Sequence, residues 1–137
     1  MRLGEKAILR GFLRSIKNYY YLTPIFILLY LFSNLNLRIV FPGDFPYLPY
    51  GYMIGCFIVG GFVLKSPIAL SLFALFESAV NMLMLILSML MPLWSVGNDI
   101  DALSTFRFGI IELIHFCIAA TVLLVGFYAN PIIRGKI

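Results

Sequence analysis

Two glutamates and the only histidine of this chain lie in stretches that are apolar enough to cross a membrane. Glu77 is the only charged residue in 68–91, and Glu112 lies three positions before His115 in 108–128. A carboxylate in the hydrocarbon of a bilayer costs several kcal/mol unless it is protonated, paired or in contact with water. These three residues are therefore the first candidates for a functional role.

Helix geometry places these side chains at similar depths. At about 1.5 Å per residue, Glu77 and His115 lie about 15 Å and about 13–14 Å into their helices, near the middle of a bilayer. Asn81 lies one turn beyond Glu77, at about the depth of Glu112. If the two stretches form neighbouring antiparallel helices, we predict that Glu77 meets His115 and that Asn81 meets Glu112.

This intramembrane cluster is compatible with three kinds of chemistry. The first is interhelical hydrogen bonding that fixes helix register. The second is handling of protons or cations, for which glutamate and histidine at mid-depth are the usual groups. The third is metal binding, because Glu112-x-x-His115 has the spacing found in carboxylate-bridged dimetal bundles. The candidate ligands are Glu77, Glu112 and His115, and a complete site needs further ligands from a second chain.

Composition assigns the chain to the membrane class. It has 137 residues, of which 62% are hydrophobic and 12% charged, whereas a soluble domain carries roughly 25% charged residues. This length holds about four spans of ~20 residues and leaves no room for a separate soluble domain. We therefore predict one transmembrane domain over residues 1–137. We expect no catalytic residue, because no nucleophile–base set is present, and we predict no cofactor except a metal ion in the third alternative.

The predicted fold is all-α, a four-helix transmembrane bundle preceded by an amphipathic helix at 1–20 that lies in the membrane interface. Thr23-Pro24 and Pro67 are helix-start signals, and Asn130-Pro131 is a stop signal. Arg38, at the polar end of the first span, is expected near the headgroups. The predicted spans are about 24–40, 48–64, 67–91 and 106–128. The basic stripe of the N-terminal helix consists of Arg2, Lys6, Arg10, Arg14 and Lys17.

The distribution of charge predicts the orientation. With four spans, eight of the ten basic residues fall on the side of the two termini. By the positive-inside rule, both termini are cytoplasmic in a plasma or inner membrane. Because the basic residues are grouped by membrane side, the net charge of +4 does not indicate nucleic-acid binding. The expected partners are the lipid bilayer and other membrane protein subunits or copies of this chain.

Small residues mark the second span as a packing helix. Gly51, Gly55 and Gly60 permit close approach of another helix, inside the bundle or from a partner. Short loops leave little room for an active site. We therefore expect a non-catalytic accessory subunit of a membrane complex, for example a membrane-bound oxidoreductase, or a homo-oligomeric scaffold. The alternatives are a small proton or cation channel or carrier, and a metal-binding subunit, both of which use Glu77, Glu112 and His115.

Overall fold

The computed structural model describes residues 3–41, 45–95 and 109–133, and all regular secondary structure within these ranges is helical. The predicted all-α class is therefore confirmed. The elements are α1 (Leu3–Tyr21), α2 (Thr23–Ser33), α3 (Leu48–Ile58), the π-helical turn η1 (Val59–Val63), α4 (Pro67–Ser95) and α5 (Ile110–Ala129).

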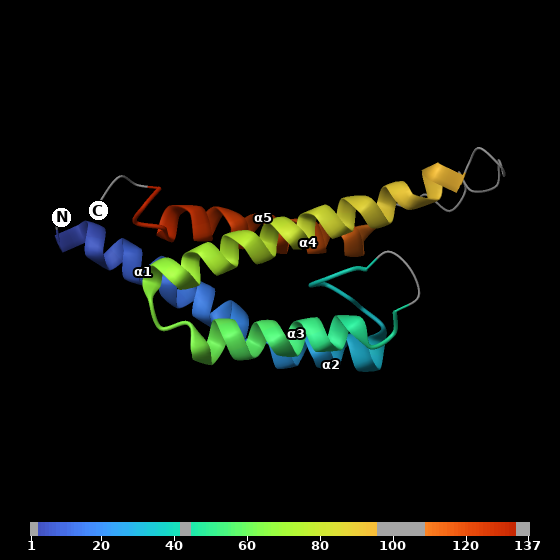
Figure 1. The fold of residues 1–137 in the computed structure, drawn as a ribbon, viewed down its shortest axis with the longest axis horizontal. Coiled ribbons are helices and arrows are strands. Elements are labelled where there is room, and N and C mark those ends of the chain that lie inside the picture. The colour runs from blue at the N-terminus through green and yellow to red at the C-terminus, as the bar shows by residue number, and fades with distance from the viewer. Residues whose placement is uncertain (1–2, 42–44, 96–108, 134–137) are drawn as a thin grey trace.

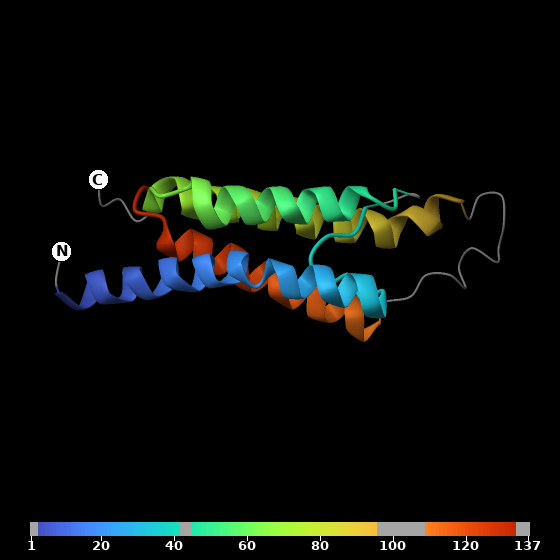
Figure 2. The same ribbon diagram turned by 90° about the horizontal axis from the view of Figure 1, so that it is seen from below.

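The helices form four rods that run side by side. Only Leu22 separates α1 from α2, and η1 directly continues α3, so each of these pairs forms one rod. Figure 1 shows α4 and α5 together on one side and α2 and α3 on the other. Figure 2 shows α1 beside α5, with which it is in contact. Helix α3 packs against the α1–α2 rod, and among the described residues of its own rod only η1 approaches the backbone of α4 closely. The first rod is therefore a neighbour of both α3 and α5, and these contacts are present.

Two of the helices are long and apolar enough to cross a membrane. They are Pro67–Met91 within α4, with a mean hydropathy of 2.0, and the whole of α5, with a mean hydropathy of 2.3. Less than half of each is buried within the chain. Large apolar side chains such as Phe76, Ile110 and Leu124 instead face outward, as expected for helices surrounded by lipid.

The first predicted span differs from the helix in the structure. Helix α2 ends at Ser33 rather than near Val40, because Asn34 adopts a left-handed conformation (φ 54°). Asparagine tolerates this conformation and commonly ends helices in it. The described residues that follow, up to Leu48, form no helix, and Figure 1 shows this segment turning back between the two helix pairs.

The N-terminal helix is packed against the bundle along its second half. Ile16, Tyr19 and Tyr20 are buried, whereas Arg10 and Arg14 are exposed. The interfacial position predicted for this helix stays a prediction. Arg2 and the first residues of the predicted span 106–128, up to Phe108, lie outside the described residues.

Close backbone approach joins α4 to α5, which are antiparallel neighbours as predicted (Figure 1). A Cβ atom at Gly126 would lie 3.3 Å from both the Ser71 carbonyl oxygen and the Leu75 amide nitrogen. These atoms belong to the backbone of α4 and cannot move independently of the helix. Gly126 therefore sets the separation of the two helices at this level.

We predict that Gly126→Leu lowers the free energy of unfolding by about 1–3 kcal/mol, because the added side chain forces α4 and α5 apart. Reversible unfolding in detergent micelles, followed by circular dichroism, measures this change. Gly11→Leu is the matched control, because a Cβ atom at Gly11 meets no atom within 4 Å. Equal stability of the two variants would contradict the packing described here.

Candidate functional site

Arg38 lies at the centre of the buried polar groups, although it comes from a segment without helix. The Asn36 side-chain oxygen accepts hydrogen bonds from the backbone amides of Arg38 (3.4 Å) and Ile39 (3.2 Å). Such a bond replaces the regular helical pairing and holds the chain in a turn. Arg38 and Ile39 are 1% and 0% exposed, so the turn carries both side chains into the bundle.

The guanidinium of Arg38 is paired with Glu77 of α4. Arg38 Nε and Nη2 donate to Glu77 Oε1 at 3.1 and 3.0 Å, and Nη1 donates to the hydroxyl of Thr23. Glu77 is 3% exposed, so both charges are removed from solvent. A buried cation and carboxylate each cost several kcal/mol to desolvate, and their mutual attraction offsets that cost.

Two tyrosines of α1 enclose the same cation. The guanidinium carbon of Arg38 lies 4.4 Å from the centre of the Tyr19 ring and 5.4 Å from that of Tyr20. Both distances are within the range in which the electron-rich face of an aromatic ring attracts a cation. Arg38 is therefore held by α1, α2 and α4 together.

Asn81 connects this ion pair to α3. Its side-chain amide donates to Glu77 Oε1 at 3.4 Å, and its carbonyl oxygen accepts from the Tyr52 hydroxyl at 2.8 Å. Glu77 and Asn81 are one helical turn apart on α4 and therefore share a face. We call the group formed by Arg38, Glu77, Thr23, Asn81 and Tyr52 the polar cluster.

Several other buried polar atoms of the bundle have no hydrogen-bond partner within the described part of the chain. They are Glu77 Oε2, the hydroxyls of Tyr20 and Ser78, and both ring nitrogens of His115. In folded proteins such groups are normally satisfied by ordered water or by another molecule. His115 is 1% exposed.

The structure distributes the four predicted cluster residues over two places. Glu77 and Asn81 are in the polar cluster, where Glu77 is paired with Arg38 and Asn81 with Tyr52. The predicted pairs Glu77–His115 and Asn81–Glu112 are not among the hydrogen bonds of the described residues. Glu112 is half-buried, and its Oε2 accepts from the Gly109 amide at 2.9 Å. It thus caps the start of α5 with one of the two bonds of a capping box, because Gly109 has no side chain to make the other.

The position of Arg38 corrects the prediction that it lies near the headgroups. That prediction extended the first helix to about Val40, which would have carried Arg38 to the end of the span. The signal that pointed to the observed position was Glu77, because a carboxylate at mid-depth needs a partner. Thr23, Tyr19, Tyr20 and Tyr52 were also not predicted, since hydroxyls and aromatic rings are common in membrane helices without any charged neighbour.

The described part of the chain does not bring Glu77, Glu112 and His115 together as one ligand group. Within residues 3–41, 45–95 and 109–133, no three His, Cys, Asp or Glu side chains come together as a ligand group. Of the three predicted metal ligands, Glu77 is bound by Arg38, and Glu112 is bound by a backbone amide. No family model, no curated protein and no solved structure matches the chain.

We predict that Arg38→Met and Glu77→Gln each lower the free energy of unfolding by about 3–5 kcal/mol, because each leaves one buried charge without its partner. The double variant Arg38→Met/Glu77→Gln should lose much less than the sum of the two, since it buries no charge. A double-mutant cycle in detergent micelles measures this coupling.

Glu112→Gln is the control for removing a carboxylate, and it should cost only about 0.3–1.5 kcal/mol because it affects a helix cap. If the single variants do not accumulate, recovery of folded protein in the double variant reports the same coupling. Costs that simply add would show that the two charges do not interact.

Proposed function

We propose that this chain is a non-catalytic subunit of a membrane complex or a homo-oligomeric scaffold, and that it is held together by the polar cluster. The observation that carries this proposal is the outward position of Gly51 and Gly55 on α3. Both glycines are exposed, and a Cβ atom at either would meet no atom of the chain within 4 Å. Glycines four residues apart on an apolar helix allow another helix to approach closely.

Gly60 differs from these two glycines. A Cβ atom there would lie 2.6 Å from the ring of Tyr20, so Gly60 already serves packing within the chain. Ile54 and Ile58 flank Gly55 on α3 and are also exposed, at 48% and 49%. A helix with small residues beside large apolar ones has the surface pattern of a helix–helix interface in membranes.

The polar cluster supports a structural role more than transport. Glu77 Oε1 accepts hydrogen bonds from Arg38 and Asn81, and the Glu77 side chain is 3% exposed. A proton or cation carrier needs polar groups that are reached by water along a path across the membrane. The rival function as a proton or cation channel or carrier would therefore require this cluster to open.

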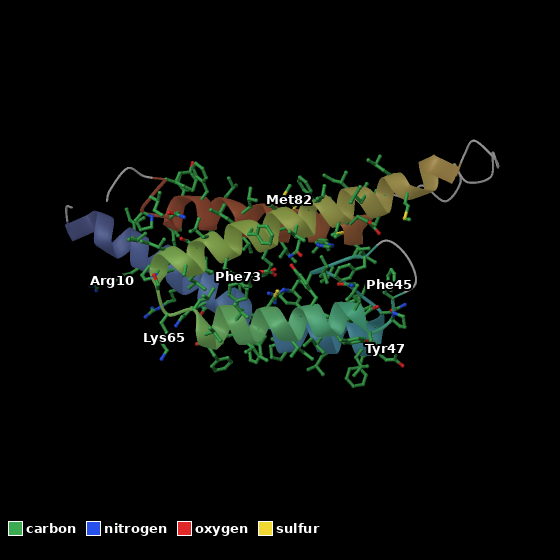
Figure 3. The ribbon with its side chains drawn as sticks, viewed as in Figure 1. Arg10, Phe45, Tyr47, Lys65, Phe73 and Met82 are labelled. Atoms are coloured by element: carbon green, nitrogen blue, oxygen red, sulfur yellow. The ribbon has the colours of Figure 1, made fainter. Side chains whose placement is uncertain are left out.

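We also propose a four-span arrangement with both termini in the cytoplasm. Alone, α2 is only 11 residues long, about 16 Å, which is too short for a hydrocarbon core of about 30 Å. In the proposed arrangement the first span therefore includes the second half of α1. Figure 3 shows Arg10 and Lys65 at the end where α1 begins, and Phe45 and Tyr47 at the opposite end. Basic residues are typical of the cytoplasmic side, and aromatic residues of the interfaces.

We predict that a reporter fused after Ile137 is active only in the cytoplasm. A fusion pair of alkaline phosphatase and a fluorescent protein tests this, because the first is active outside the cytoplasm and the second within it. The same pair inserted in the segment 96–108 should report the opposite side. A C-terminal reporter on the outer face would contradict the span number or the orientation.

We predict that Gly51→Leu/Gly55→Leu reduces association of the chain with its partner or with itself at least tenfold, the equivalent of about 1.4 kcal/mol. Native mass spectrometry after gentle extraction, with crosslinking in intact membranes, measures the associated fraction. Gly11→Leu is the control, because it makes the same substitution at an open position on a different helix. A wild-type chain that is a stable monomer and conducts protons in liposomes would overturn the proposal in favour of its rival.

A further inference from the structure

A groove runs between the α1–α2 rod and α5, on the side where Figure 2 shows them next to one another. Its volume is about 670 Å³. The deeper walls are apolar, with Leu22 and Phe26 on one side and Ile118 and Val122 on the other. Neither Arg38 nor Glu77 lines it, and Tyr19, whose ring covers Arg38, lies between the groove and the polar cluster.

Two exposed basic residues, Arg10 and Arg14, precede Ser15, the first residue of α1 that lines this groove. Phe12 stacks on Tyr128 with ring centres 6.3 Å apart, which places this part of α1 level with the last turn of α5. Arg10 and Arg14 lie within two residues of Phe12, and both are exposed. If α5 spans the membrane, its last turn lies at the surface, and these two arginines lie at the level of the lipid headgroups.

The polarity of the α1–α2 wall changes in order along the groove. Asn18 follows Arg14 by one helical turn on the same face, about 6 Å deeper. Asn18 is exposed and lines the groove. Leu22 and Phe26 follow at the next two turns. With increasing depth, this wall presents a cation, then an amide and then apolar side chains. This is the order in which a phospholipid presents its phosphate, its glycerol backbone and its acyl chain.

Two hydroxyl groups of the groove are already bonded to their own helices. The Ser15 hydroxyl donates to the Gly11 carbonyl at 3.1 Å, and the Thr121 hydroxyl donates to the Cys117 carbonyl at 2.7 Å. Below Asn18 most of the side chains that line the groove are apolar. An occupant of this part gains most from being apolar, as an acyl chain is.

We propose that this groove binds one anionic phospholipid, with its phosphate at Arg14, its glycerol region at Asn18 and an acyl chain between α1–α2 and α5. The charge of Arg10 and Arg14 selects an anionic over a zwitterionic headgroup. This inference rests on the proposed membrane placement, and it is independent of the proposed assembly through Gly51 and Gly55.

Native mass spectrometry of the full chain tests the site, with phosphatidylglycerol and phosphatidylcholine of identical acyl chains added in equal amounts. The wild type should retain phosphatidylglycerol in preference. Arg14→Gln should reduce that retention about fivefold, the effect of one basic residue near a membrane surface. Lys65→Gln is the control, because Lys65 is exposed at the same end but lies between η1 and α4, which do not line the groove.

A second variant tests the acyl-chain part. Cys117 is exposed and lines the groove, so Cys117→Trp should lower retention of both lipids while the helical content stays unchanged. Equal retention of the two lipids by the wild type, or equal effects of Arg14→Gln and Lys65→Gln, would overturn the proposed site.

Two further results separate this inference from its premises. Release of the chain from membranes by alkaline carbonate would overturn the membrane placement, and with it the lipid site. A disulfide between Cys117 residues of two chains, formed in membranes on mild oxidation and prevented by Cys117→Ser, would instead show that a second copy fills the groove. Retention of the lipid preference by a chain that is integral in the membrane and forms no such disulfide supports the proposal.

Discussion

The pairing of Arg38 with Glu77 is the constraint on which the rest of this fold depends. Neither charge is stable alone in an apolar bundle, because desolvation costs each of them several kcal/mol. Glu77 is fixed in the middle of a long apolar helix, so its partner must come to it. The chain meets this requirement by ending α2 at Ser33 and turning the following segment inward, so that Arg38 and Ile39 become fully buried. The non-helical segment is thus a necessary part of the bundle rather than a simple connection.

The same ion pair explains how separate helices are held in one arrangement. Thr23 of α2, Tyr19 and Tyr20 of α1 and Glu77 of α4 all contact the one guanidinium, and Tyr52 of α3 reaches it through Asn81. Lipid provides no hydrophobic drive that would press these helices together, so directional contacts of this kind determine how they pack. Helix α5 is joined differently, through the close approach of Gly126 to the backbone of α4. The polar contacts of Arg38 therefore fix α1, α2, α3 and α4 relative to one another, and the steric contact at Gly126 fixes α5 against α4.

Much of the helical architecture follows from the sequence, because hydropathy and proline positions act locally. The helices of α4 and α5 and their antiparallel contact were predicted on that basis. The position of Arg38 was not, because it depends on where a helix ends, and a single asparagine in a left-handed conformation decides that at Asn34. Glu112 illustrates the opposite case. Its role as a cap was readable from its spacing to Gly109, three residues earlier, but its apolar surroundings favoured a role deeper in the membrane.

Because the buried polar cluster is closed to ligands, we expect binding of lipids or other helices on the outer surface of this chain. Within the polar cluster, the charge of Arg38 is matched by Glu77 and covered by two aromatic rings, so it has little remaining affinity for a ligand. The surface, in contrast, carries features that the fold itself does not use: two glycines on α3 without neighbours, and a groove beside exposed arginines. To react with a substrate, Arg38 and Glu77 would have to separate. Their separation would leave two buried charges without partners, which is energetically costly. A protein built in this way is suited to present fixed surfaces to lipids and to other helices.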